Sequence, residues 1–214
     1  MKALIPSLFV FPLLFSCGSG EEEVETESSN QTEETVNTEE VVVSEVENKI
    51  LLGSEVCGNF IIGKTVPDLP KGLKIRHFTK ELNNGSGSAM EETHNVIFSQ
   101  LEDVVELIMD QGSNEHHDDR LIKEMIVLSN YYHTDDSIAV GSTIEDLKYT
   151  YADHSFFYSG TENKYYAESP LIPKVEFIFS EDDVKKKVNS TAEKTQISAS
   201  AFKDGAKITK IRIY

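Results

Sequence analysis

Three pairs of segments match one another in the same order along this chain, and they indicate an internal repeat. The matching segments are 61–69 with 139–147, 105–109 with 175–179, and 122–128 with 208–214. The first pair shares Gly, Thr, Asp and Leu at an offset of 78 residues, and the offsets of the other two pairs are 70 and 86. Different loop lengths explain this drift. The repeat restricts the chain to folds in which matched segments adopt the same structure.

The repeat also decides between helix and strand for the apolar segment 97–108. Its apolar residues have the spacing that one face of a helix requires. The matching segment 174–179 follows a proline and is rich in β-branched and aromatic residues, which favour strands. Both segments are therefore predicted to be strands. The alternating segment 208–214 and its counterpart 121–130 are predicted to be strands as well.

Each unit begins with a strand that ends at a glycine, Gly63 or Gly141. At these two positions we expect a positive φ or a close backbone approach. In the second unit Thr143 is expected to cap a short helix, with Asp146 completing a capping box. Pro67 predicts that the matching helix of the first unit is shorter or absent. About three more strands are expected to complete each unit.

These units predict an α+β fold: two degenerate helix-on-antiparallel-sheet repeats, residues 49–134 and 135–214, forming one domain after a disordered tether. The Gly-x-Thr-apolar-x-Asp-Leu turn at 63–69 and 141–147 resembles the start of the helix–sheet unit in small outer-membrane assembly lipoproteins and in the duplicated β-lactamase inhibitory protein. The region 50–214 resembles uncharacterised Bacteroidota cell-envelope lipoproteins. The resemblance implies fold and location, and it implies no catalytic residues.

The N-terminal residues are typical of an export signal. A positively charged start precedes an apolar stretch that is too short to span a bilayer. The run at 14–18, Leu-Phe-Ser-Cys-Gly, resembles the lipobox of bacterial lipoproteins. Residues 1–16 are therefore predicted to be a lipoprotein signal peptide. Cys17 is predicted to carry lipid such as palmitate and to anchor the chain to the outer membrane. A buried cysteine near an ordinary secretory cleavage site is the alternative.

Residues 17–48, from the lipidated cysteine onwards, are predicted to form an acidic disordered tether. Between residues 21 and 47 there are eleven Glu and no Lys or Arg. Such a stretch repels itself and has too little apolar surface to fold. The run at 19–23, Ser-Gly-Glu-Glu-Glu, resembles the surface-export signal of Bacteroidota lipoproteins. A solvated spacer without a sorting role is the alternative, so periplasmic and surface orientations both stay open.

The overall charge excludes one class of partner. Asp and Glu number 37 against 20 Lys and Arg, which gives a net charge of −17. Because binding to a phosphate backbone depends on concentrated Lys and Arg, we do not expect nucleic acid as a partner. The two cysteines are too few for a disulfide framework.

The histidines are the natural candidates for metal or acid–base chemistry. One cluster occurs at 115–119, where His116, His117, Asp118 and Asp119 are weak candidates for metal ligands. Adjacent side chains of an extended chain diverge, so a solvated loop is the simpler interpretation, and no cofactor is expected. Cys57 is expected to be a buried small hydrophobe and not a nucleophile.

The densest aromatic stretch supplies the candidate partner-binding surface. Its members are Tyr149, Tyr151, Phe157, Tyr158, Tyr165 and Tyr166. Alternate aromatic side chains of a strand normally point inward, so core packing is the alternative interpretation for these residues.

The sequence contains no serine nucleophile elbow, His-Glu-x-x-His, phosphate-binding loop, dinucleotide fingerprint or EF-hand loop. It therefore predicts a non-catalytic, membrane-anchored lipoprotein that acts as a binding or assembly module in the bacterial cell envelope. Its expected partner is a protein or another envelope component. The alternative is an envelope hydrolase whose site no sequence motif reveals.

Overall fold

The computed structural model describes residues 51–83, 89–111 and 119–214. The chain divides into two units, Met1–Glu45 and Val46–Tyr214, and every described residue belongs to the second unit. The predicted signal peptide, the lipidation site Cys17 and the tether at 17–48 therefore lie outside the described residues.

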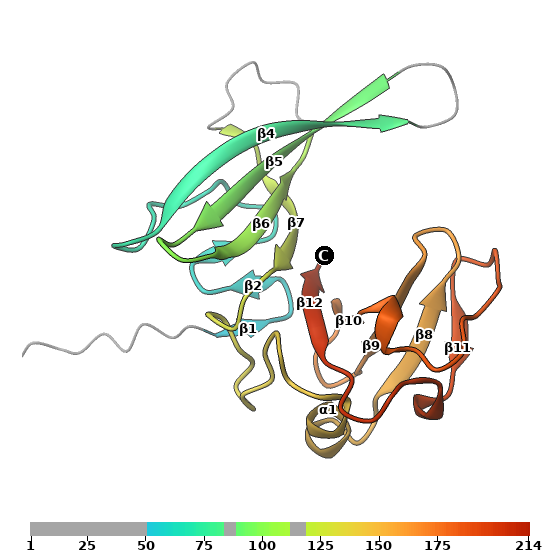
Figure 1. The fold of residues 1–214 in the computed structure, drawn as a ribbon. Helices are drawn as coiled ribbons and strands as arrows, with labels where there is room; N and C mark the ends of the chain where they lie inside the picture. Colours follow the sequence, from blue (N-terminus) through green and yellow to red (C-terminus); the bar gives the residue numbers. More distant parts are fainter. Residues whose placement is uncertain (1–50, 84–88, 112–118) are drawn as a thin grey trace, which may run out of the picture. The chain divides into compact units, whose positions relative to one another are not determined.

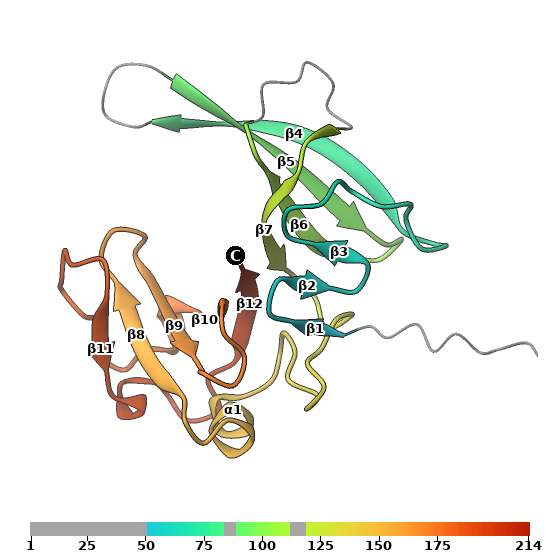
Figure 2. The same cartoon turned by 180° about the vertical axis from the view of Figure 1, so that it is seen from behind.

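The described chain is built around one large antiparallel sheet of nine strands, in the order β11-β8-β9-β10-β12-β7-β6-β5-β4 (Figure 1). These strands are β4 (Lys74–Asn83), β5 (Ala89–Phe98), β6 (Asp103–Met109), β7 (Ile122–Val127), β8 (Ser155–Ser159), β9 (Lys164–Glu168), β10 (Val175–Phe179), β11 (Thr195–Ile197) and β12 (Ile208–Ile213). Three short strands form a separate sheet: β1 (Leu52–Gly53), β2 (Val56–Cys57) and β3 (Phe60–Ile61). Seen from behind, this small sheet lies in front of β6 and β7 (Figure 2).

One α-helix is present among the described residues, α1 (Ile144–Thr150). The Thr143 side chain accepts a hydrogen bond from the Asp146 amide at 3.2 Å, and the Asp146 carboxylate accepts one from the Thr143 amide at 2.8 Å. The predicted capping box is therefore confirmed. The Thr143 amide and hydroxyl both donate to the Asp146 carboxylate, and these two bonds hold the pKa of Asp146 below its ordinary value. Ile144 and Leu147 are buried and fix the helix to the core.

The predicted α+β class was wrong. Residues 65–70 form no regular element, so the prediction that the first unit's helix is shorter or absent is confirmed. Pro67 gives the physical reason, since proline lacks the backbone donor that a helix interior needs. The described chain has a mostly β fold, with one seven-residue helix beside a nine-stranded and a three-stranded sheet, and it does not contain two helix-on-sheet repeats.

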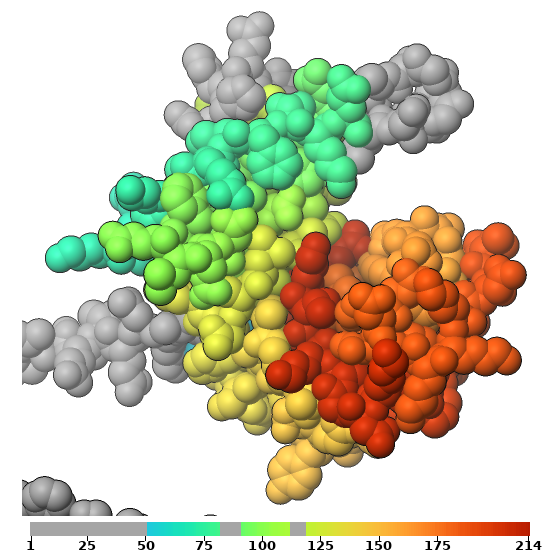
Figure 3. Space-filling model, viewed as in Figure 1, coloured from blue at the N-terminus to red at the C-terminus, as the bar shows by residue number. Residues whose placement is uncertain are grey.

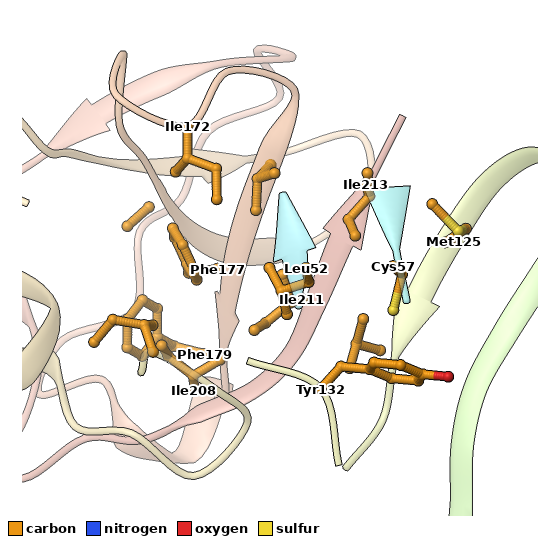
Figure 4. Packing of buried hydrophobic residues seen from close by; sticks show 14 of the residues in the cluster. Leu52, Cys57, Met125, Tyr132, Ile172, Phe177, Phe179, Ile208, Ile211 and Ile213 are labelled. Carbon is orange, nitrogen blue, oxygen red and sulfur yellow. The ribbon is translucent and has the colours of Figure 1, made fainter. Parts of the chain in front are cut away.

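The hydrophobic core lies on one face of the large sheet, which receives alternate side chains of β10 and β12 (Figure 4). Labelled core residues include Phe177, Phe179, Ile208, Ile211 and Ile213 from these two strands, and Leu52, Cys57, Met125, Tyr132 and Ile172 from other elements. Cys57 is fully buried, and burial raises the pKa of its thiol. The expectation that Cys57 is a buried small hydrophobe is confirmed. We call the opposite face of the large sheet the outer face.

Two strand pairs of the large sheet have the same register. Val105 lies opposite Val127 in the β6–β7 pair, and Val175 lies opposite Ile213 in the β10–β12 pair. The register of each pair shifts at an equivalent position, between Ile108 and Met109 in β6 and between Ile178 and Phe179 in β10. The segments that match in sequence at offsets of 70 and 86 thus make matching hydrogen-bond ladders.

The two halves of the large sheet meet at β7 and β12, which pair antiparallel with Ile126 opposite Arg212. At the sequence offset of 86, these two residues are each other's equivalents. When a residue of one strand pairs with the equivalent residue of an antiparallel strand, a local twofold axis passes between the two residues. The register therefore places a pseudo-twofold axis between Ile126 and Arg212, at the middle of the sheet.

The two matched glycines also make equivalent contacts. Gly63 donates to the Ile122 carbonyl at 2.8 Å, and Gly141 donates to the Ile208 carbonyl at 2.8 Å. Their φ values are 76° and 93°, so the expected positive φ is confirmed. This conformation favours glycine because a Cβ would crowd the backbone.

We predict that Gly63→Ala and Gly141→Ala each lower the free energy of unfolding by about 1 kcal/mol. Apart from the glycine and its two chain neighbours, no atom lies within 4 Å of the position that a Cβ would take at either site, so the cost arises from backbone conformation alone. Urea denaturation of each variant measures it. Gly53→Ala is the control, because Gly53 has the same open space without a positive φ. An equal loss in the control would contradict the explanation.

Candidate functional site

The outer face is polar near its middle because the strands alternate. In β10, Val175 and Phe177 point to the core, and Glu176 between them points to the outer face. In β12, Ile211 and Ile213 are in the core, and Arg212 points outward. Charged side chains from four neighbouring strands are thereby brought together.

These side chains surround a cavity of about 630 Å³ that spans β7, β12, β10 and β9. In the space-filling view the surface is notched between the green and the orange strands, where the red end of the chain lies (Figure 3). We call this cavity the charged hollow. It is lined by Lys123, Glu124, Ser159, Glu162, Lys164, Tyr166, Glu168, Glu176, Glu193, Lys194, Arg212 and Tyr214.

Arg212 lines the charged hollow and contacts three carboxylates. Its Nε and Nη2 atoms each donate to Glu124 at 2.7 Å, which is the two-pronged geometry that guanidinium groups favour. Its Nη1 atom donates to Glu162 at 3.2 Å and lies 3.5 Å from Glu176. Because these bonds come from several directions, the guanidinium is fixed in one orientation.

Two lysines extend this network. Lys164 Nζ donates to Glu176 at 2.6 Å, contacts Glu162, and lies 5.0 Å from the centre of the Tyr166 ring. Lys194 Nζ donates to Glu168 at 2.6 Å and lies 4.1 Å from the centre of the Phe157 ring. Both ammonium groups therefore combine an ion pair with an aromatic face.

The pKa values reflect the balance of burial and charge in the hollow. Burial alone would lower the pKa of Arg212, but the hydrogen bond and charge of Glu124 outweigh it, and the pKa is raised. Burial likewise works against ionisation of Glu162, and the contacts with Lys164 and Arg212 outweigh it, so this pKa is lowered. Burial and the nearby carboxylates raise the pKa of Tyr166. Arg212 and Glu162 are thus both ionised at neutral pH.

A related cluster lies on the outer face of the other half of the sheet. His94 is almost fully buried, with Nδ1 2.7 Å from Glu106 and Nε2 3.1 Å from Glu92. The Phe78 ring stacks on the His94 ring, with their centres 5.0 Å apart. Among the described residues, no group of three or more His, Cys, Asp or Glu has an arrangement that could hold a metal ion.

Carboxylates, ammonium groups and one guanidinium supply most of the polar groups that line the charged hollow. Neither His nor Cys is among its described lining residues. The hydroxyl of its serine, Ser159, is hydrogen-bonded to the Thr161 hydroxyl at 3.1 Å and accepts a hydrogen bond from the Glu162 amide at 3.2 Å. What the hollow offers a ligand is an array of fixed hydrogen-bond donors and acceptors.

The predicted aromatic residues are spread through the fold and do not form one surface. Tyr151, Tyr158 and Tyr165 are buried in the core, and Tyr151 stacks on Phe177 with ring centres 5.8 Å apart. Tyr149 is 93% exposed on α1.

Of the remaining aromatic candidates, Phe157 is partly exposed on the outer face, and Tyr166 is buried beneath the charged hollow. Core packing therefore accounts for most of the stretch. The two residues that share the outer face, Phe157 and Tyr166, are the ones that the structure brings together beside the hollow.

Most of the predicted metal ligands lie outside the described residues. His116, His117 and Asp118 lie outside the described residues, and Asp119 is exposed. Within the described ranges, no helix is long and apolar enough to cross a membrane.

The charged residues Glu176 and Arg212 of the hollow were not among the residues predicted from the sequence. A signal was present, because Glu176 interrupts Val-Glu-Phe and Arg212 interrupts Ile-Arg-Ile in segments already predicted to be strands. The alternation of a strand places both side chains opposite the core. The register that brings Arg212 to Glu124, 88 positions away, is not visible in the sequence.

Comparisons with known proteins give little guidance to this site. No protein-family model matches the sequence, and no curated protein matches it. The crystal structure of the uncharacterized protein yfeY from Escherichia coli is similar, with a TM-score of 0.43 and 14% sequence identity, over 65% of this chain and 80% of that chain. We draw no argument about function from a similarity of this size.

Proposed function

We propose that this protein is a non-catalytic, lipid-anchored binding or assembly module of the bacterial cell envelope, and that the charged hollow is its binding site. The observation that carries this proposal is the network around Arg212, which is bound by Glu124, Glu162 and Glu176. On this proposal, lipid on Cys17 holds the chain at the outer membrane, and the acidic residues that follow separate the binding domain from the bilayer.

The network supports binding because it is ordered before a ligand arrives. Glu124 and Glu176 are buried, and Arg212 and Lys164 each contact at least two carboxylates. Side chains that already occupy one conformation lose little entropy when a ligand binds. A network of this kind is costly to bury and therefore indicates a use beyond packing.

Capture from intact envelopes tests the proposal. The full-length protein would be crosslinked in envelope fractions and recovered, as wild type and as the double variant Lys164→Ala, Lys194→Ala. We expect the wild type to recover a component that the double variant loses. The matched control is Lys185→Ala, Lys187→Ala, since both lysines form exposed ion pairs outside the hollow.

Equal capture by all three proteins, at unchanged melting temperatures, would contradict the assignment of the site. The anchor is tested separately in the same cells by Cys17→Ser, which should release the chain from the membrane fraction and prevent labelling with palmitate. A variant that stays in the membrane fraction would contradict the anchor.

A further inference from the structure

The outer face carries two pairs of neighbouring rings, one in each half of the large sheet; the first pair is stacked and the second is tilted. Phe78 of β4 lies opposite His94 of β5, and their ring centres are 5.0 Å apart. Phe157 of β8 lies opposite Tyr166 of β9, and their ring centres are 5.6 Å apart. Figure 1 shows β4 and β5 on one side of the β7–β12 junction, and β8 and β9 on the other.

These two pairs occupy equivalent positions about the pseudo-twofold axis. His94 lies opposite Ile108 of β6, and Tyr166 lies opposite Ile178 of β10. Ile108 and Ile178 are equivalents at the offset of 70 residues that relates β6 to β10. Counting outward from the axis, each half therefore places an aromatic pair on its third and fourth strands.

Each ring pair also has a carboxylate beside it at an equivalent position. Glu106 contacts His94 at 2.7 Å in the first half. Its equivalent, Glu176, contacts Lys164 at 2.6 Å in the second half, and Lys164 lies over the Tyr166 ring. The outer face thus presents the same combination twice, an aromatic pair with a charged hydrogen-bonding group next to it.

The charges of the hollow indicate an uncharged ligand. Its lining includes four cationic side chains, those of Lys123, Lys164, Lys194 and Arg212, and five glutamates. Each of the four cations contacts at least one carboxylate. An anionic or cationic ligand would compete with an existing ion pair, whereas a hydroxyl group can both donate and accept within the network.

The position on the sheet favours a polyhydroxylated ligand over a peptide. An extended peptide binds best at a sheet edge, where free backbone groups pair with it. Backbone groups in the middle of this sheet are used in the ladders to neighbouring strands. Sugar rings have apolar faces that stack on aromatic side chains and hydroxyl groups that bond to fixed carboxylates and ammonium groups.

We infer that the outer face binds a linear, uncharged oligosaccharide across both aromatic pairs, with the charged hollow between them. Six strand spacings separate the two pairs, which corresponds to roughly 29 Å along a flat sheet and less on a curved one. Stacking on a ring does not depend on the direction of the sugar chain, so a directional polymer can use both pairs. This inference rests on the proposed function, because it names the ligand of the same site.

Calorimetric titration of the full chain with neutral oligosaccharides tests the inference. The probes are β-glucan, mannan, galactan and chitin fragments, each as disaccharide, tetrasaccharide and octasaccharide. We expect at least one series to bind, with the octasaccharide at least tenfold tighter than the disaccharide. Phe78→Leu and Phe157→Leu should each weaken octasaccharide binding about tenfold, which is about 1.4 kcal/mol. Leucine keeps the side chain apolar and similar in size, so the melting temperature should change little.

Leu101→Ala is the matched control, because Leu101 is 96% exposed in the turn between β5 and β6 and lies in neither ring pair. Binding of an anionic oligosaccharide or a peptide, without binding of any neutral series, would overturn the inference. So would octasaccharide affinity that is insensitive to Phe78→Leu, because it would show that one half of the face suffices. Envelope capture that depends on Lys164 and Lys194 would in those cases still support the proposed function.

Discussion

Replacement of Gly160 by alanine is expected to destabilise the domain by roughly 3 kcal/mol, the upper part of the usual range for overpacking. A Cβ at this position would lie 2.7 Å from the Ser190 carbonyl carbon and 2.9 Å from Thr191 Cα, and closer still to the Ser190 oxygen. These are backbone atoms, which cannot rotate away as a flexible side chain would. The Gly160 amide also donates to the Ala192 carbonyl at 2.8 Å, so moving the segments apart would break a hydrogen bond.

Urea denaturation of Gly160→Ala against wild type measures this loss. Gly53→Ala is again the matched control, with an expected change within about 0.5 kcal/mol. A variant as stable as the wild type would show that the close approach of 160 to 190–191 does not exist in the protein.

Arg212→Leu is expected to destabilise the domain by about 2–3 kcal/mol, because it leaves buried carboxylates without their partner. Glu124 and Glu176 are both less than 10% exposed, and their desolvation is compensated in the folded protein by the guanidinium. The matched control is Arg76→Leu. The Arg76–Asp103 ion pair is largely exposed, so its removal should cost at most about 1 kcal/mol.

The effect of Arg212→Leu should depend on pH. The folded protein holds the pKa of Glu162 below its ordinary value, so ionised Glu162 contributes stability above the unfolded pKa and loses it as the pH falls through the folded pKa. The difference between Arg212→Leu and wild type should therefore be full at neutral pH and shrink on acidification below the ordinary glutamate pKa. A difference that is constant over this range would contradict a role for these charges.

The strands of the core were predictable because their signal is local. Segments 105–109 and 175–179 are largely apolar, and the match between them favoured strands over a helix. The structure contains these strands as β6 and β10. The two glycines were predictable for the same reason, since few residues other than glycine adopt a positive φ easily. The fold class was not, because short helices were expected to cover one face of the sheet, whereas the described residues form one seven-residue α-helix beside a nine-stranded and a three-stranded sheet.

The charged hollow could not be predicted, because strand pairing assembles it from distant positions. Glu124, Glu176 and Arg212 come from β7, β10 and β12, and only the register places them side by side. The dense aromatic stretch was misleading for a related reason. Pairing of β8 with β9 sends Tyr158 and Tyr165 to the core and leaves Phe157 and Tyr166 on the outer face.

Hydroxyl-radical footprinting of the protein with and without its captured envelope ligand tests most directly whether the charged hollow is the binding site. Bound ligand is expected to slow oxidation of Phe157 and Tyr214, which lie at the hollow or on the outer face beside it. Oxidation of Tyr149, which is 93% exposed on α1, should stay unchanged. Protection of Tyr149 while Phe157 and Tyr214 react as before would contradict a binding site at the charged hollow and place it elsewhere.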